Sequence, residues 1–84
     1  MKTQASRTVC YSWTLDDSEA PGVDASVEYE IDDHLKQEQA DGFVVDFDTG
    51  RGRMVWFTAA PGRRARALRD WVASRLPPAW RQGE

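Results

Sequence analysis

A glycine-rich segment between two apolar runs restricts the fold of this chain more than any other local pattern. The runs span residues 43–48 and 53–58, and Thr49-Gly50-Arg51-Gly52 separates them. Two strand-forming runs joined by a few residues that include glycine are typical of a β-hairpin. The sequence therefore predicts at least one pair of antiparallel strands near the middle of the chain.

The geometry of this turn decides which hairpin residues face the core. A turn centred on Gly50-Arg51 pairs Val45 with Trp56 and gathers Phe43, Val45, Phe47, Met54 and Trp56 on one face. We therefore expect Trp56 in the core. On the other face, the same register predicts a cross-strand ion pair between Asp48 and Arg53. A three-residue loop with a bulge would reverse the faces and exchange Trp56 with Phe57.

Two segments before the hairpin carry periodic patterns. Residues 8–15 alternate between apolar and polar side chains, which predicts a half-buried strand. In residues 25–31 the alternation of Val27, Tyr29 and Ile31 with acidic residues favours a strand, although a four-residue spacing continuing to Leu35 favours a helix. We expect a strand, because Tyr29 then joins the other apolar residues, with a short helix over residues 33–40. The alternative element order is strand, helix, strand, strand, helix.

The C-terminal third predicts a helix that starts at Pro61 and ends near Leu76. An apolar stripe at three- and four-residue spacing marks its buried side, and Pro77-Pro78 ends it. We expect Trp80 to fold back over the sheet edge; an exposed Trp80 acting as a partner anchor is the alternative. The predicted fold class is α+β, an antiparallel sheet of three or four strands with a C-terminal amphipathic helix packed on one face.

Length and composition limit the class of protein. The 84 residues predict one small domain over residues 1–84, with flexible residues 1–6 and a proline-terminated tail at 77–84. A single cysteine excludes an internal disulfide and favours a reducing compartment. Neither a signal peptide nor a membrane-spanning run is visible, so we expect a cytoplasmic protein, monomer or homodimer, without a membrane partner.

No residue pattern predicts catalysis. Cys10 and His34 are the one pair that resembles a nucleophile and its base, and nothing in the sequence places them together. The aspartates 46 and 48 fit a structural ion pair better than acid–base chemistry, and Gly50-Arg51-Gly52 lacks the residues of a phosphate-binding loop. We expect no enzyme activity, no cofactor and no metal site.

Charge is strongly segregated along the chain and bears on possible partners. Residues 16–49 carry a net charge of −11 and residues 50–84 a net charge of +6, within a total of −3. The two halves could neutralise each other by packing together, or the acidic side could meet a basic partner. Lysine, isoleucine and asparagine are scarce relative to arginine and alanine, which indicates a GC-rich genome such as that of a bacterium or its phage.

Our first functional hypothesis is a small non-enzymatic protein that binds another protein as an inhibitor or adaptor. Its acidic surface would engage a basic partner site, as an anti-CRISPR or another anti-defence protein of a phage or mobile element would. The candidate partner-binding residues are Asp16, Asp17, Glu19, Glu28, Glu30, Asp32, Asp33 and Trp80.

The alternative hypothesis is nucleic-acid binding through the hairpin and the C-terminal helix. Arginines interleaved with aromatic residues can contact phosphates and stack on bases, and the candidates are Arg51, Arg53, Arg63 and Arg66. The acidic isoelectric point, about 5.1, disfavours this alternative.

Overall fold

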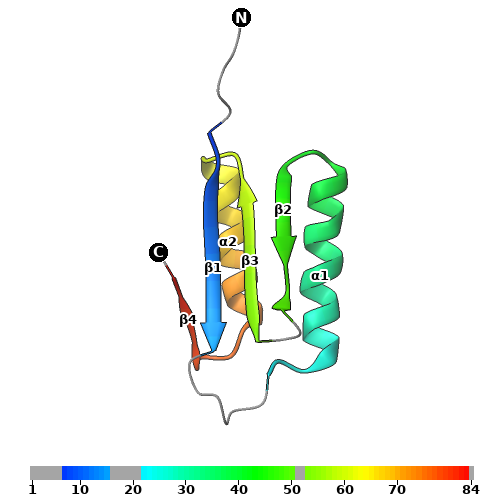
Figure 1. Ribbon diagram of the computed structural model, residues 1–84, viewed down its shortest axis with the longest axis vertical. Coiled ribbons are helices and arrows are strands. Elements are labelled where there is room, and N and C mark those ends of the chain that lie inside the picture. The colour runs from blue at the N-terminus through cyan, green and yellow to red at the C-terminus, as the bar shows by residue number, and fades with distance from the viewer. Residues whose placement is uncertain (1–6, 16–21, 51–52, 84) are drawn as a thin grey trace, which may run out of the picture.

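A computed structural model describes residues 7–15, 22–50 and 53–83, and these form four strands and two helices (Figure 1). The elements are β1 (Val9–Leu15), α1 (Ala25–Ala40), β2 (Val44–Asp48), β3 (Met54–Ala59), α2 (Arg63–Arg75) and β4 (Trp80–Gln82). All neighbouring strands are antiparallel, in the order β2-β3-β1-β4. The α+β prediction is therefore confirmed, with four strands. The β-α-β-β-α-β order is that of the ferredoxin-like motif.

Residues 25–40 form one continuous helix, so the predicted strand over residues 25–31 is wrong. Ile31 and Leu35 are fully buried on the four-residue spacing, while Tyr29 is 71% exposed. A helix is more stable here than a strand because it places the apolar stripe against the core and the acidic residues on the opposite side. The structure matches the alternative element order, with a fourth strand added after α2.

A glycine ends α1 and turns the chain toward β2. Gly42 has a φ of +89°, a conformation that favours glycine. Its N–H donates to the carbonyl of Gln39, and the N–H of Phe43 donates to the carbonyl of Glu38, both at 3.0 Å. This pair of hydrogen bonds is the Schellman motif. As a result β2 runs back alongside α1 (Figure 1).

Next to the turn, the hairpin strands pair in a register that exchanges the two predicted faces of β3. Phe47 pairs with Phe57 and Asp48 pairs with Trp56, so the predicted pairing of Asp48 with Arg53 is wrong. Phe57 is fully buried, whereas Trp56 is half-buried on the other face of the sheet. The prediction that Trp56 lies in the core is therefore also wrong.

A bulge in β2 explains how both strands still bury apolar residues. The register shifts between Val44 and Asp46, which leaves Val45 59% exposed. Because the extra residue is taken up at Val45, Val44 and Phe47 can both reach the buried cluster. Without the bulge, Val44 and Phe47 would point to opposite faces of the sheet, because side chains alternate along a strand.

The core is one buried cluster to which every element contributes. Its members are Trp13, Ile31, Leu35, Val44, Val55, Phe57, Ala59, Leu68, Val72 and Trp80. Leu68 and Val72 of α2 belong to this cluster, and Figure 1 shows α2 behind β1 and β3. Phe57 is fully buried in this cluster, with its ring centroid 5.6 Å from that of Tyr11 and 6.0 Å from that of Trp13.

The C-terminal tail folds back onto the sheet, as the preferred expectation for Trp80 required. Trp80 pairs with Leu15 across β1 and β4, and it is 9% exposed. The backbone N–H of Gly83 also donates to the carbonyl of Ser12 at 2.8 Å. The tail is thus an edge strand rather than a free anchor.

Candidate partner-binding surface

The most exposed aromatic side chain among the described residues is Tyr29, on the acidic side of α1. It is 71% exposed, with Glu28 next to it and Asp32 and Asp33 one helical turn further on. We call these four residues the acidic face of α1. The sequence reasoning missed Tyr29 because it assigned this residue to a buried strand face. A helical wheel of residues 23–35 would have placed it opposite the apolar stripe.

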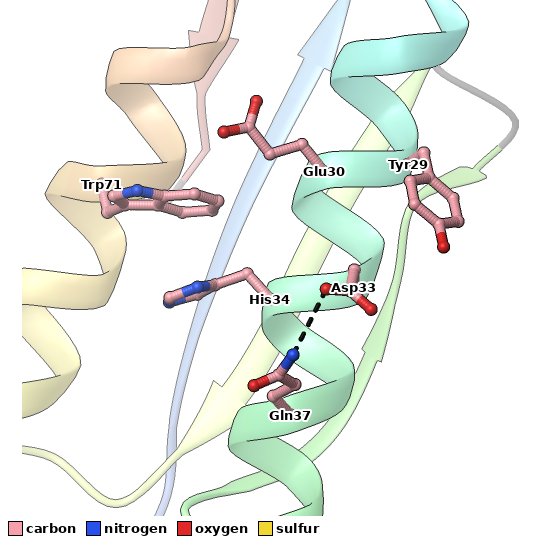
Figure 2. Close-up of a pocket in the computed structure, with 6 residues that line it drawn as sticks. All are labelled: Tyr29, Glu30, Asp33, His34, Gln37 and Trp71. Atoms are coloured by element: carbon pink, nitrogen blue, oxygen red, sulfur yellow. Dashed lines mark hydrogen bonds between the residues drawn. The ribbon is translucent and has the colours of Figure 1, made fainter.

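Two open hollows lie on either side of Tyr29. The first, which we call the interhelical pocket, has a volume of about 360 Å³ and is lined by Tyr29, Glu30, Asp33, His34, Gln37 and Trp71 (Figure 2). The second has a volume of about 370 Å³ and is lined by Ala25, Glu28, Tyr29, Asp32 and Thr49. Tyr29 is therefore a ridge between two hollows, each of which contains two carboxylates.

Aromatic and ionic contacts join α1 to α2 beside the interhelical pocket. The His34 imidazole stacks on the Trp71 indole with ring centroids 4.1 Å apart. On one side of this stack, Arg75 donates a hydrogen bond to Glu30 at 2.8 Å. Figure 2 shows Glu30 and His34 pointing toward α2 on either side of the Trp71 ring. The wall of the pocket that faces α2 is thus built by contacts between residues far apart in the sequence.

A second arginine of α2 binds the C-terminal end of α1. Arg64 donates to Glu38 at 2.6 Å and to Asp41 at 3.2 Å, and its guanidinium lies 4.4 Å from the centroid of the Phe43 ring. The hydrogen bond to Glu38 raises the pKa of the Arg64 guanidinium above its usual value. Within α2, the hydrogen bond to Asp70 likewise raises the pKa of Arg69. The acidic and basic parts of the chain therefore do neutralise each other in part.

The predicted partner-binding residues divide into three groups. Asp16, Asp17 and Glu19 lie outside the described residues. Glu28, Glu30, Asp32 and Asp33 are together on α1, and Trp80 is buried in β4. Within α1, Glu30 is paired with Arg75, and Asp32 lies 3.5 Å from the ammonium of Lys36. Glu28 and Asp33 form no salt bridge with any residue in the described ranges.

The arginines of the nucleic-acid alternative are not gathered into one site. Arg51 lies outside the described residues, and Arg53 is half-buried just before β3. Arg63 and Arg66 are exposed at the start of α2, which follows the far end of β3. Arg53 and the start of α2 are therefore separated by the length of β3, which is about 17 Å at ~3.3 Å per residue.

Residues with catalytic or metal-binding chemistry are also apart. Cys10 is exposed on β1, whereas His34 stacks on Trp71 between the helices. The described part of the chain contains no group of three residues suited to hold a metal ion. Asp46 and Asp48 each accept a backbone hydrogen bond, from Phe47 and Gly50 respectively. Neither described helix has the length and apolar character needed to cross a membrane.

Comparisons with protein-family models, with curated proteins and with solved structures each found no match to this chain. The ferredoxin-like order of elements supports many unrelated functions, so the fold does not indicate one. The exposed residues of α1 are therefore the features of this chain that bear most directly on function.

Proposed function

We propose that this protein is a non-enzymatic inhibitor or adaptor that acts in the cytoplasm by binding a basic surface of a partner protein through the acidic face of α1. The observation that carries this proposal is Tyr29, which stands 71% exposed between two carboxylate-lined hollows. An aromatic side chain this exposed buries little apolar area in the isolated chain.

Tyrosine is among the residues that contribute most to protein interfaces. Its ring buries a large apolar area, and its hydroxyl can bond at the edge of the contact. The hollows on both sides of Tyr29 give a partner room to insert side chains, which increases the area that the ring can bury. Tyr29 is therefore the expected centre of the interface.

The carboxylates around Tyr29 give the interface its charge preference. Glu28 and Asp33 lack salt-bridge partners among the described residues, so their charge is available to a cationic surface. Charge of this kind accelerates association more than it tightens binding. It also repels nucleic acid from this face, which favours a protein partner.

The proposal includes an arrangement of the helices. We propose that α2 packs across the inner face of the sheet, which sets Trp71 beside α1. The shared buried cluster of Leu68, Val72 and Phe57 supports this packing. The α1 face is then held rigidly, and binding costs little conformational entropy.

The biological class we propose is an anti-defence inhibitor of a phage or mobile element, of which anti-CRISPR proteins are one kind. A small acidic protein can occupy a basic site that normally holds nucleic acid. The small size, the acidic surface and the GC-rich composition support this choice.

The test is affinity capture with matched variants from a nuclease-treated lysate of the source organism. We expect the full chain to enrich one partner that Tyr29→Ala and the double variant Glu28→Lys/Asp33→Lys both lose. Arg66→Gln, an exposed change on α2, should retain it. Tyr29→Ala should keep the melting temperature, because exposed substitutions change stability by about 0.5 kcal/mol or less.

The captured partner then allows a kinetic test. In stopped-flow mixing at low salt, Glu28→Lys/Asp33→Lys should slow association by roughly tenfold, and added salt should reduce the difference. A partner captured equally by all variants, or one that disappears with the nuclease treatment, would contradict the proposal. The second outcome would favour nucleic-acid binding instead.

A further inference from the structure

We propose that the interhelical pocket binds an arginine side chain of the partner protein. This inference rests on the function proposed above and names the partner group that the pocket recognises. The site consists of the carboxylates of Glu30 and Asp33 together with the rings of Tyr29, His34 and Trp71.

The pocket combines the two features that a guanidinium needs. Carboxylates accept its N–H groups, and aromatic rings pack against its flat face. Figure 2 shows the Glu30 carboxylate on one side of the Trp71 ring, whereas Asp33 lies further round α1, on the side nearer Tyr29. Asp33 accepts a hydrogen bond of 3.3 Å from the neutral amide of Gln37, and no described cation forms a salt bridge with it. Its negative charge is thus available to an incoming side chain.

The chain itself already shows this mode of binding at the edge of the pocket. The guanidinium of Arg75 lies 2.8 Å from Glu30 and 6.0 Å from the centroid of the Trp71 ring. The Arg75 side chain is 40% exposed, so this contact is made at the surface. A partner arginine entering from solvent would meet the same carboxylate and could bond Asp33 as well.

Arg75 also competes with that partner. While it is bonded to Glu30, only part of the pocket's negative charge is available to an incoming group. Removing Arg75 should therefore strengthen binding of an arginine side chain beyond the effect of losing one positive charge. This expectation separates a specific site from general attraction to an acidic protein.

Arginine should be preferred over lysine in this pocket. A guanidinium can bond a carboxylate through two N–H groups while its face rests on an aromatic ring such as that of the exposed Tyr29, whereas an ammonium is a compact and strongly hydrated charge. Because the pocket is open to solvent, the cation–ring contribution corresponds to a preference of roughly two- to fivefold.

The experiment measures the affinity of two fluorescent probes, hexaarginine and hexalysine, for the full chain by anisotropy at low salt. We expect hexaarginine to bind more tightly, and Glu30→Gln/Asp33→Asn to abolish this preference. Arg75→Gln should strengthen hexaarginine binding several-fold. Arg66→Gln is the matched control, because it removes the same charge from an exposed position on α2, and it should have the smaller effect.

A local readout accompanies the affinities. In a ¹⁵N-edited NMR titration with hexaarginine, the indole N–H signal of Trp71 should shift, and the signal of Trp80 in β4 should not. The comparison of these two tryptophans places the peptide at the pocket without relying on a variant. It therefore remains informative if one of the substitutions disturbs folding.

Two results would overturn the inference, and they differ in what they say about the proposed function. Equal affinity for both peptides, with Arg75→Gln and Arg66→Gln acting alike, would exclude an arginine site but leave an acidic binding face intact. If neither peptide binds at low salt, the inference fails together with the electrostatic basis of the proposed function.

Discussion

The register of the hairpin decides which face of the sheet is buried, and paired substitutions at Phe57 and Trp56 test it directly. Phe57 is fully buried, while its chain neighbour Trp56 is half-buried on the opposite face. We expect Phe57→Ala to destabilise the protein much more than Trp56→Ala. The tryptophan has the larger side chain, so size alone predicts the reverse order.

The magnitudes follow from the surroundings of each ring. A buried Phe→Ala change costs about 3–5 kcal/mol. Phe57 also loses ring contacts with Tyr11 and Trp13, at 5.6 and 6.0 Å, each worth about 0.5–1.5 kcal/mol, so the upper half of that range applies. Trp56 has the cross-strand neighbours Ser12 and Asp48, and at about 0.2–1 kcal/mol each, its loss should cost no more than about 2 kcal/mol.

The assay is urea unfolding followed by far-UV circular dichroism, with linear extrapolation to water. A chain of this length has a stability of about 4–13 kcal/mol, so Phe57→Ala could be largely unfolded. Phe57→Leu, which keeps most of the volume and should cost about 1.5 kcal/mol or less, gives a measurable second point. A larger loss of stability for Trp56→Ala than for Phe57→Ala would refute the register and return Trp56 to the core.

Three further predictions concern other parts of the fold. Deleting residues 79–84 removes β4 and the buried Trp80, so calorimetry should show a melting temperature lower by about 4–8 °C for each kcal/mol lost; an unchanged value would contradict the packing of β4. Gly42→Ala should cost about 1–2 kcal/mol in chemical unfolding, because φ is +89° there, whereas Ala60→Gly in the exposed β3–α2 connection should cost less. Cys10 is exposed on β1, so a thiol reagent should modify it in the folded protein without urea, and modification that requires urea would argue against this exposure.

The length of the first helix shows how one residue can mislead a prediction from sequence. The four-residue spacing of Val27, Ile31 and Leu35 predicted the helix, and Tyr29 argued for a strand only on the assumption that it is buried. Tyr29 is exposed, so the assumption failed and the strand with it. An aromatic residue suited to an interface breaks the rule that large apolar side chains lie inside, and the same property makes it a functional candidate.

The hairpin shows a different limit. Both of its faces carry large apolar residues, so alternation alone does not select the buried one. In the structure the register shift between Val44 and Asp46 accompanies the choice, since Val44 and Phe57 both lie in the buried cluster and Phe47 packs against it. The existence of the hairpin was predictable from the sequence, whereas the face that it buries was not.

Local signals in the sequence are enough to predict three parts of the fold. These are the alternation of β1, the glycine-linked hairpin, and α2 with Pro61 before it and Pro77-Pro78 after it. The alternation of a strand, the three- and four-residue spacing of a helix and the helix end at proline all arise from backbone geometry over a few residues. They can therefore be recognised without knowing the rest of the fold.

Only contacts between distant parts of the chain determine which acidic residues of α1 have an arginine neighbour. Glu30 meets Arg75 across 45 residues of sequence and Glu38 meets Arg64 across 26, while Glu28 and Asp33 stay without such partners among the described residues. Contacts of this kind depend on how α1 and α2 lie against each other. No local pattern records that arrangement, because it depends on the buried cluster to which both helices contribute residues.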